Sequence, residues 1–434
     1  MSLAQIAAAA ATPIRRGRLV EAVGLALRAE GLNAAIGQRL IIRGAHGDTA
    51  AEVVGVRDGS TLMMPLGSTS GLQIGAPVES APGGNRVPVG EALLGRVIDG
   101  LGRPLDGLGP IVAERDVPLR GAPAHPLMRR PVTQVLTTGV PVVDAVLTLG
   151  RGQRIGIFAG GGVGKSTLLA RLVEGADCDV CVVALIGERG REVEEWVHRT
   201  LGAEGLARSV VVAATSADPP LLRARGALHA TALAEGFRDA GKRVLLVMDS
   251  VTRYAMALRE VGLAAGEPPA TKGYTPSVFA ALPHLLERAG TGTGQGSITG
   301  VYTVLVEGDE LSDPIADAAR AILDGHIVLS RRLAERDHYP AIDVRASISR
   351  VMAHIVSNEQ DQDARQARRL LADAEEAEEL RSLGAYRPGE REDLDEALAR
   401  KSALNALLCA PRVDDAADAL ATVVRGALPE SGTQ

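Results

Sequence analysis

Aromatic residues are scarce in this sequence of 434 residues, which contains one Trp, five Tyr and three Phe. None of them precedes Phe158. Proteins that bind single-stranded nucleic acid stack bases on aromatic rings, and the chain before Phe158 has no Phe, Tyr or Trp ring for this purpose. A formal net charge of −6 also excludes a uniformly basic surface. The sequence therefore predicts no nucleic-acid partner.

Cysteine is also rare, with three residues in the chain. An odd number in a sequence of this length fits a reducing compartment better than a disulfide framework. Cys178 and Cys181 form a CxxC pair, but residues 179–186 are expected to form a buried strand, in which residues three apart face opposite sides. No second cysteine pair completes a zinc site. A functional thiol pair is therefore not expected.

Long hydrophobic runs are missing as well. No stretch of about 18 apolar residues occurs, so the sequence predicts no membrane-spanning helix. The short alanine run at residues 7–11 has no basic segment before it, which argues against a signal peptide. Together with the few cysteines, these absences favour a cytoplasmic protein.

A chain of this length is expected to form two or three domains. Residues 17–89 contain short apolar runs separated by turn residues roughly every eight to twelve positions, which is typical of a small β-barrel. Residues 90–131 are rich in Gly and Pro and are expected to form a connector with little regular structure.

From residue 139 to about 344, apolar strands alternate with helical stretches. Strands are predicted at 155–158, 180–186, 210–213, 244–248 and 301–306, with helices between them, for example at 192–201 and 221–239. This alternation predicts a mostly parallel sheet covered by helices on both faces. Beyond Ser349 the spacing is helical, at 363–383, 394–408 and 416–428.

Residues 154–169 read RIGIFAGGGVGKSTLL. The order predicts a buried strand, a tight glycine loop and the start of a helix. Glycines let successive backbone N–H groups surround an anion, and a helix N-terminus adds partial positive charge there. The stretch thus predicts a phosphate-binding P-loop. Its nucleotide-binding residues would be Gly160, Gly161, Gly162, Val163, Gly164, Lys165, Ser166 and Thr167.

Within this loop, Lys165 would reach the β- and γ-phosphates of a nucleotide, and Ser166 would offer its hydroxyl to Mg²⁺. The pattern G-x-x-x-x-G-K-[ST] requires glycine at its first position, where this chain has Ala159. Alanine is tolerated at a strand-to-loop junction if its φ remains negative. The alternative interpretation is a glycine-rich turn before an ordinary helix.

Two other predicted strands lead into carboxylates. The strand at 244–248 is followed by Asp249, as expected for the Mg²⁺-coordinating strand of a P-loop NTPase. The strand at 180–186 is followed by Glu188, the first acidic residue beyond it. Hydrolysis needs a carboxylate that polarises a water in line with the γ-phosphate, and Glu188 is the candidate. Alternatively, Glu188 caps the following helix or pairs with a neighbouring arginine.

Long stretches of the sequence resemble the ATPases of type III protein export, which are homologues of the catalytic F1-ATPase subunit. The resemblance covers essentially the whole chain. It rests on GRGQRIGIFAGGGVGKSTLL from Gly150, ALIGERGREVEEW from Ala184, KRVLLVMDSVTRYAMALREVGLAAGEPPATKGYTPSVFAALPHLLERAG from Lys242, and VEGDELSDPIADAARAILDGHIVLSRRLAERDHYPAID from Val306. Three segments resemble the flagellar branch more than the virulence injectisome branch in sequence: TRYAMALREV, GEPPATKGYTPSVF and RAILDGHIVLSRRLAE.

The resemblance implies an α/β fold with a RecA/F1-like P-loop core, a small N-terminal β-barrel and a C-terminal helical domain. We expect an N-terminal segment at 1–16, the β-barrel domain at 17–89, the RecA-like ATP-binding domain at 90–345 and the helical domain at 346–434. Two departures from the family pattern, Gly161 and Pro141, remove no catalytic group.

The resemblance also implies roles for the matching residues. Lys165 and Ser166 match the phosphate lysine and the Mg²⁺ hydroxyl. Glu188 matches the catalytic carboxylate, and Arg189 matches an arginine that senses the nucleotide phosphate. Asp249 matches the carboxylate that acts on Mg²⁺ through water. ATP and Mg²⁺ are therefore the implied substrate and cofactor.

Two further matches lie later in the chain. Tyr339 matches the aromatic residue that stacks on adenine, although a tyrosine packed under a loop is an alternative. Arg350 matches the arginine finger that a neighbouring subunit inserts toward the γ-phosphate. Because this chain contains both Glu188 and Arg350, the resemblance implies a homohexamer in which identical copies complete each site.

The implied function is ATP hydrolysis that energises unfolding, chaperone release and export of flagellar proteins. Implied partners are a stator-like negative regulator at the N-terminus, a central stalk protein in the ring pore, export chaperones with their cargo, and the membrane export gate. Residues 5–11 could form a short helix for the regulator, or a frayed terminus. The implied location is cytoplasmic, peripheral to the inner membrane at the export apparatus.

Three alternatives remain at this point. A virulence injectisome ATPase would share all the motifs. An RNA-translocating hexameric ATPase shares the core but needs the aromatic stacking residues that the N-terminal part lacks. A non-catalytic ring subunit of a rotary ATPase is disfavoured because such subunits usually lack the carboxylate that Glu188 supplies.

Overall fold

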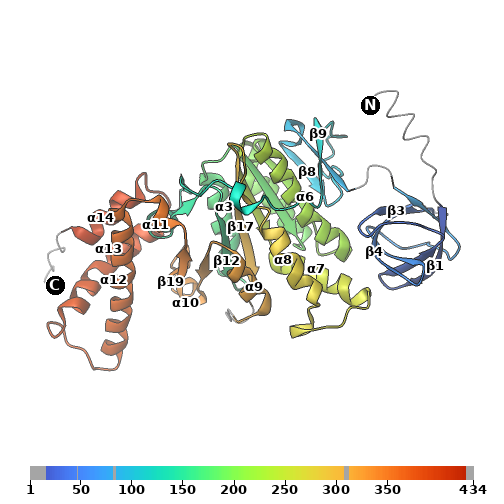
Figure 1. Cartoon of the computed structure of the whole chain (residues 1–434). Coiled ribbons are helices and arrows are strands. Elements are labelled where there is room, and N and C mark those ends of the chain that lie inside the picture. Colours follow the sequence, from blue (N-terminus) through green and yellow to red (C-terminus); the bar gives the residue numbers. More distant parts are fainter. Residues whose placement is uncertain (1–15, 46, 82–84, 307–311, 427–434) are drawn as a thin grey trace.

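Six short strands close into a barrel near the N-terminal end of the chain (Figure 1). The computed structural model describes residues 16–426, apart from 46, 82–84 and 307–311. The barrel strands are β1 (Arg16–Val23), β2 (Ala26–Glu30), β3 (Arg39–Ile42), β4 (Thr49–Arg57), β5 (Ser60–Pro65) and β6 (Pro77–Ser80). They pair in the order β1-β2-β5-β4-β3-β6, and β6 returns to β1. The predicted barrel is confirmed, while residues 5–11 lie outside the described part.

Aliphatic and methionine side chains fill the barrel. Alternate residues of a strand point to opposite faces, so Leu40 and Ile42 of β3 are buried while their neighbours are partly exposed. Leu19, Leu27 and Met63 complete the interior from other strands. The barrel core therefore forms without any Phe, Tyr or Trp.

A nine-stranded sheet forms the centre of the molecule. Its strands are β8 (Arg96–Asp99), β12 (Arg154–Ala159), β13 (Val180–Ile186), β14 (Ser209–Ala214), β15 (Arg243–Asp249), β16 (Gly290–Thr291), β17 (Ser297–Leu305), β18 (Gly325–Leu329) and β19 (Ile342–Ser349). The order is β19-β18-β12-β17-β15-β13-β14-β8, with β16 beside β17. Only β16 and β19 pair antiparallel among the strands of this sheet in the described chain. The predicted parallel sheet is confirmed.

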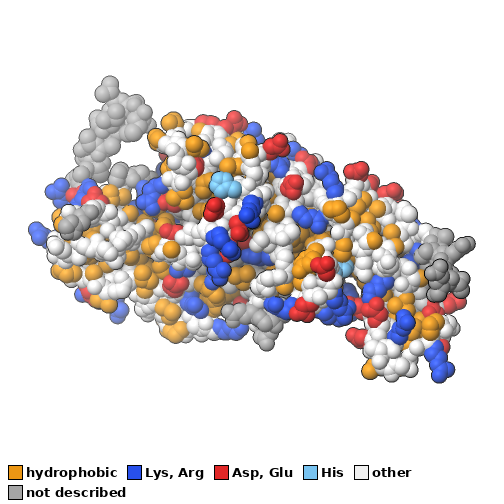
Figure 2. Space-filling view, turned by 180° about the vertical axis from the view of Figure 1, so that it is seen from behind, with side chains coloured by type: hydrophobic (Ala, Val, Ile, Leu, Met, Phe, Trp, Pro, Cys, Tyr) orange, Lys and Arg blue, Asp and Glu red, His pale blue; other side chains and the backbone are white. Residues whose placement is uncertain are grey.

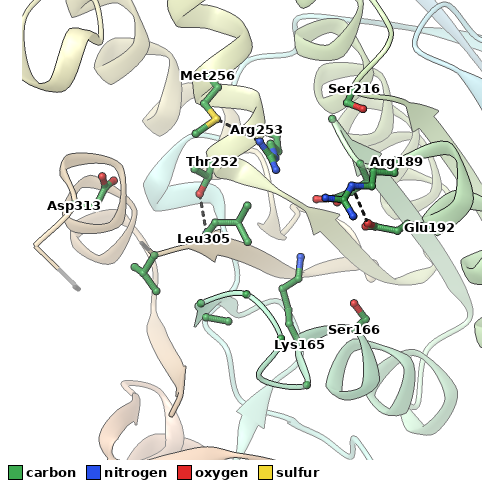
Figure 3. Close-up of a pocket in the computed structure, with 18 of the residues that line it drawn as sticks. Lys165, Ser166, Arg189, Glu192, Ser216, Thr252, Arg253, Met256, Leu305 and Asp313 are labelled. Carbon is green, nitrogen blue, oxygen red and sulfur yellow. Dashed lines mark hydrogen bonds and ion pairs between the residues drawn. The ribbon is translucent and has the colours of Figure 1, made fainter. Parts of the chain in front are cut away.

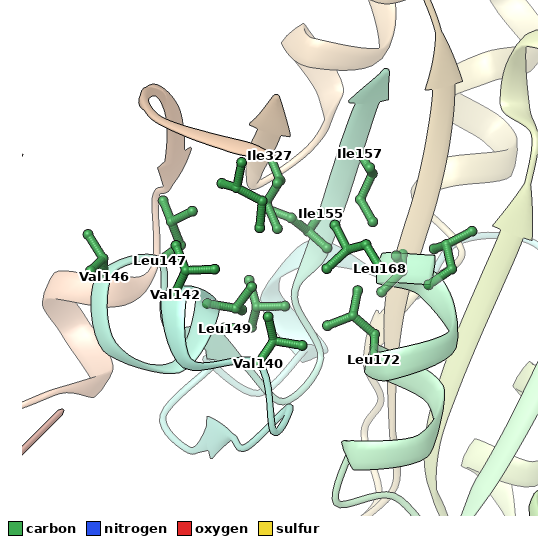
Figure 4. Packing of buried hydrophobic residues seen from close by; sticks show 14 of the residues in the cluster. Val140, Val142, Val146, Leu147, Leu149, Ile155, Ile157, Leu168, Leu172 and Ile327 are labelled. Atoms are coloured by element: carbon green, nitrogen blue, oxygen red, sulfur yellow. The ribbon is translucent and has the colours of Figure 1, made fainter. Parts of the chain in front are cut away.

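Helices cover both faces of this sheet (Figure 1). The main ones are α3 (Lys165–Gly175), α6 (Pro220–Asp239), α7 (Val251–Ala264), α8 (Pro276–Leu286) and α9 (Pro314–Ile322). Ile155 and Ile157 of β12 pack toward Leu168 and Leu172 of α3 (Figure 4). Phe158, the next residue of β12, packs on the other face, in the core shared with α6 to α9.

The segment 90–131 departs from expectation because it is more regular than a loose connector. β8 pairs in parallel with β14 and forms one edge of the central sheet. The Asp106 carboxylate covers this edge by accepting hydrogen bonds from the backbone N–H of Val97 at 3.0 Å and from the Arg96 guanidinium. A four-residue strand between glycines is too short to give a periodic pattern, and its place in the sheet depends on the distant partner β14.

Short elements complete the central part. They are β7 (Arg86–Val89), η1 (Glu91–Leu93), β9 (Arg115–Pro118), η2 (Pro126–Met128), β10 (Val135–Leu136), α2 (Pro141–Val146), β11 (Leu149–Gly150), α4 (Gly190–Glu195), η3 (Trp196–Leu201), α5 (Gly202–Ala207), η4 (Thr271–Gly273) and α10 (Arg331–Ala334). β7 and β9 form a separate antiparallel pair outside the barrel. Pro141 begins α2, where its missing N–H has no helical partner to lose.

The C-terminal part is helical, as predicted. It contains α11 (Met352–Ile355), α12 (Asn358–Ser382), α13 (Glu392–Cys409) and α14 (Ala416–Arg425). The Ser357 hydroxyl caps α12 by accepting a hydrogen bond from the Gln360 N–H at 3.1 Å. Leu370, Leu404 and Leu420 of the three long helices join the same buried core as α2 and α3.

The surface carries acidic and basic side chains intermingled over the face seen in Figure 2. In the described part of the chain, no helix combines the length and apolar character needed to cross a membrane.

A buried ion pair attaches the barrel to the central part. The Arg225 guanidinium of α6 donates a hydrogen bond to Glu52 of β4 at 2.7 Å. Arg120 contacts the other carboxylate oxygen at 3.1 Å. Glu52 is 2% exposed and Arg225 is 4% exposed. Removing one partner would therefore leave a buried charge without full compensation.

We predict that Arg225→Ala lowers the thermal unfolding midpoint, because breaking a buried ion pair typically costs about 3–5 kcal/mol. Scanning calorimetry measures the change. Arg57→Ala is the matched control, because Arg57 is 90% exposed in its pair with Asp58 and should have almost no effect. The double variant Glu52→Ala/Arg225→Ala should lose less than the sum of the single variants. An unchanged midpoint in Arg225→Ala would contradict the role of this pair.

Candidate functional site

A pocket of about 1010 Å³ opens at the carboxyl ends of β12, β13, β15 and β17 (Figure 3). Open α/β sheets usually place their ligands at this edge. The predicted residues that line it are Gly160, Gly161, Gly162, Gly164, Lys165, Ser166, Thr167, Glu188 and Arg189. Val163, Asp249, Tyr339 and Arg350 are not among its described lining residues.

The glycine loop has the backbone shape that the sequence predicts. β12 ends at the buried Ala159, so this residue lies in a strand, where alanine fits as well as glycine. Gly162 and Gly164 have φ values of +79° and +90°, which other residues rarely adopt. Val163 between them is 1% exposed and packs into the core. Val163 therefore anchors the loop and can offer a phosphate only its backbone.

Lys165 and Asp249 form an ion pair, although the sequence assigns them to separate motifs. Lys165 begins α3, and Asp249 ends β15. Asp249 also accepts a hydrogen bond from the Thr303 hydroxyl at 2.7 Å. Both side chains are largely buried, at 14% and 3% exposure. A carboxylate and an ammonium thus stand beside the glycine loop.

Glu188 is nearly buried at the end of β13, with 9% exposure. Burial and the nearby negative charge of Asp249 raise the pKa of Glu188 to about 8. A carboxyl whose pKa lies near neutral pH is suited to accept a proton. The described structure supports neither alternative interpretation, because α4 begins without a side-chain cap and Arg189 pairs with Glu192 (Figure 3).

The oxygen atoms of Ser166 and Asp249 suit a Mg²⁺ ion that binds together with a nucleotide. Among the described residues, no cluster of three or more His, Cys, Asp or Glu could hold a metal ion. Ser166 and Asp249 nevertheless offer oxygen atoms at the pocket and beside it. Mg²⁺ commonly keeps several waters and binds through one or two protein groups plus substrate phosphates. The residues present fit this arrangement.

Tyr339 lies at the outer side of the glycine loop. A Cβ atom added to Gly164 would lie 3.2 Å from Tyr339 Cε1, so the ring rests against the loop. Tyr339 as a residue is also 42% exposed, which leaves room for a stacking partner. Tyr339 is therefore not packed under a loop as the alternative interpretation requires.

Arg350 does not reach the pocket of its own chain. It follows β19, at the edge of the central sheet, and is exposed. Its guanidinium donates hydrogen bonds to the carbonyl oxygens of Leu323 at 3.3 Å and Arg320 at 3.4 Å. Within one chain, the structure separates Arg350 from Glu188.

The sequence analysis missed Arg253, which lines the pocket from the first turn of α7. Its Nε atom is buried and has no hydrogen-bond partner in the described structure. Its side chain packs on Gly187, where an added Cβ would lie 2.9 Å from Arg253 Cβ. The signal was available, because the first turn of a helix that follows the Asp249 strand necessarily faces the same edge.

Comparisons with known families cover most of the chain. Residues 139–349 match the nucleotide-binding domain of the ATP synthase alpha/beta family, and residues 16–81 match its beta-barrel domain. Residues 356–423 match the T3SS EscN ATPase C-terminal domain. The fold implied by the resemblance is confirmed in all three parts.

Individual relatives are similar along nearly their whole length. The flagellum-specific ATP synthase of Pseudomonas aeruginosa is 53% identical over 395 residues, which is 90% of this chain and 88% of that protein. The type 3 secretion system ATPase of Xanthomonas euvesicatoria is 51% identical over 92% of this chain and 90% of its own length. The solved structure of the assembled ATPase EscN from enteropathogenic E. coli has a TM-score of 0.90 and 42% identity, covering 94% of this chain and 100% of EscN.

We predict that Glu188→Gln stabilises the fold more at pH 8.5 than at pH 5. The raised pKa means that the folded state disfavours the ionised carboxylate, so stability is lost as pH rises from about 4.5 through about 8. Glutamine cannot ionise and avoids this loss. The thermal unfolding midpoint should rise by at least about 2 °C at pH 8.5.

Glu194→Gln is the matched control, since Glu194 is exposed on helix α4, which begins two residues after Glu188. Its effect on the unfolding midpoint should be equal at the two pH values. A Glu188→Gln effect that does not change with pH would contradict the raised pKa.

Proposed function

The chain belongs to the ATP synthase alpha/beta family, among the flagellum-specific and type III secretion ATPases, and we propose that the pocket described above is its ATP-hydrolysing site. The observation that carries the proposal is the meeting of Lys165, Asp249 and Glu188 at one edge of the sheet. Each of these residues comes from a different strand-to-helix junction, and together they supply phosphate contact, metal contact and a base.

In the proposed site, the backbone N–H groups of residues 160–164 surround the phosphates. Lys165 breaks its ion pair with Asp249 and contacts the β- and γ-phosphates instead. Ser166 and, through water, Asp249 would hold Mg²⁺, which would supply positive charge to offset that of the phosphates. Arg189 senses the nucleotide phosphate. The adenine base stacks on the exposed ring of Tyr339.

Glu188 acts as the base in this mechanism. It accepts a hydrogen bond from a water and takes its proton as the water oxygen bonds to the γ-phosphorus. The bond from the γ-phosphorus to the β–γ bridging oxygen breaks, and that oxygen leaves with ADP. The raised pKa of Glu188 favours proton uptake at this step.

The site is completed by a second copy of the chain. Arg350 lies outside the pocket of its own chain, on an exposed edge, and phosphoryl transfer gains from a cation that offsets developing charge. The similarity to EscN, which was solved in an assembled form, supports a homohexameric ring in which Arg350 of one copy faces Glu188 of the next.

This ATPase serves protein export. We propose the flagellar export machine as its site of action, and the injectisome is the alternative. Flagellum-specific names are frequent among its relatives, while others are type 3 secretion system ATPases. EscN was also solved in complex with its central stalk EscO, which supports a stalk in the pore of this ring. The proposed regulator at residues 1–16, the chaperones with cargo, the membrane export gate and the place at the inner membrane follow from the resemblance.

We predict that Glu188→Gln and Arg350→Ala each lower ATP turnover by at least about a hundredfold while nucleotide binding persists. Mixing the two inactive variants should restore part of the activity, because some neighbouring pairs then combine an intact Glu188 with an intact Arg350. Steady-state phosphate release measures turnover. Mixtures that stay as inactive as the separate variants would contradict a finger acting between copies.

In cells, we predict that replacing the native gene with the Glu188→Gln variant abolishes swimming and release of filament protein into the medium. A wild-type copy at the same locus is the control, and immunoblots confirm equal protein levels. Loss of effector secretion with normal swimming would instead assign the protein to an injectisome.

A further inference from the structure

Arg171 lies on α3, the helix that begins at the P-loop lysine, about 9 Å further along the helix axis than Lys165. Its Nη2 atom donates hydrogen bonds to the carbonyl oxygens of Ala410 at 3.0 Å and Pro411 at 2.6 Å. Both carbonyls follow the last turn of α13. A cation therefore lies at the negative end of α13 and binds two carbonyl groups just beyond the helix.

The end of α13 also lies next to Tyr339. Burial raises the pKa of the thiol of Cys409, the last residue of α13, and the nearby Tyr339 backbone lowers it by a smaller amount. The Tyr339 ring in turn rests against Gly164 at the end of the glycine loop. Residues 409–411, which we call the C-terminal turn, thus contact the residue that we propose stacks on adenine.

These contacts connect the P-loop and α3 to the C-terminal turn by two routes. The path runs from Gly164 to Tyr339, on to the C-terminal turn, and back through Arg171 to the same helix α3. Because one end of α3 carries the phosphate contacts, the path sets the distance between the phosphates and the stacking ring.

We propose that Arg171 is a positioning residue for the purine base: it holds the C-terminal turn, and through it the Tyr339 ring, at a defined distance from the P-loop. This inference rests on the proposed function, because it takes Tyr339 as the base-stacking residue. It adds to that function a contribution of the C-terminal helices to nucleotide affinity. Arg171 is not among the described lining residues of the phosphate pocket, so its loss leaves the chemical step in place.

The test compares a ligand that has a base with one that has none. In the full-length protein, Arg171→Ala should raise the Kd of Mg–ATP about 3- to 10-fold, as expected for losing part of one stacking contact. The inhibition constant of inorganic tripolyphosphate should stay unchanged, because this ligand contacts only the P-loop. The kcat at saturating ATP should stay within about twofold of the wild type.

Arg368→Ala is the matched control. Arg368 of α12 also docks the C-terminal helices through a carbonyl, that of Val146 at 2.7 Å, but through α2 rather than the C-terminal turn. It should leave the Kd of ATP unchanged. In a Tyr339→Ala background, Arg171→Ala should have no further effect, because the ring that it positions is gone.

Arg171→Lys is the second variant, in case Arg171→Ala fails to fold by circular dichroism. Lysine keeps the charge but lacks the fork that reaches two carbonyls, so the Kd of ATP should rise by a smaller factor. Equal weakening of ATP and tripolyphosphate, an effect as large in Arg368→Ala, or an unchanged Kd would overturn the inference. Failure of the wild-type protein to bind Mg–ATP would instead overturn the proposed function.

Discussion

Parallel pairing of β12, β17, β15 and β13 brings the ends of four strands to one edge of the sheet, and the candidate site depends on this register. Ala159 lies beside Leu305, and Leu185 lies beside Asp249. A glycine loop and two carboxylates that are far apart in sequence therefore meet at one edge of the sheet, with Glu188 lining the pocket and Asp249 paired to Lys165 beside it. The same strands bury alternate residues against α3 and against α6 to α9, which holds the edge in place.

The buried carboxyl groups at this edge of the sheet lower the stability of the fold but suit a site that binds a charged ligand. Glu188 and Asp249 are both nearly buried, and Lys165 pairs with only one of them. Burial and the charge of Asp249 therefore raise the pKa of Glu188 to about 8 in the folded protein without nucleotide. Such clustering of buried charge is unfavourable in an ordinary core and is typical of sites built to meet a charged ligand. Mg²⁺ and a γ-phosphate would change the balance of charge around Glu188.

The barrel and the C-terminal helices are attached to the centre by different interactions. The barrel uses the buried Glu52 and Arg225 pair, which cannot separate without leaving a buried charge uncompensated. The C-terminal helices use arginine-to-carbonyl bonds from Arg171 and Arg368. Water can replace a neutral carbonyl partner at a lower cost than a buried carboxylate. The C-terminal helices are also held by the apolar core that they share with α2 and α3, so their attachment does not depend on these hydrogen bonds alone.

The sequence by itself determined the local parts of this protein. The glycine loop before Lys165, the strands that lead into Asp249 and Glu188, and the helical C-terminal part are readable because strand, turn and helix patterns lie within a few adjacent residues. Tertiary structure alone decided that β8 joins the central sheet, that Arg350 lies away from its own pocket, and that Arg171 meets Ala410 and Pro411. The contacts of β8 with β14 and of Arg171 with Ala410 join residues more than a hundred positions apart, and no local pattern records which distant group a side chain will meet.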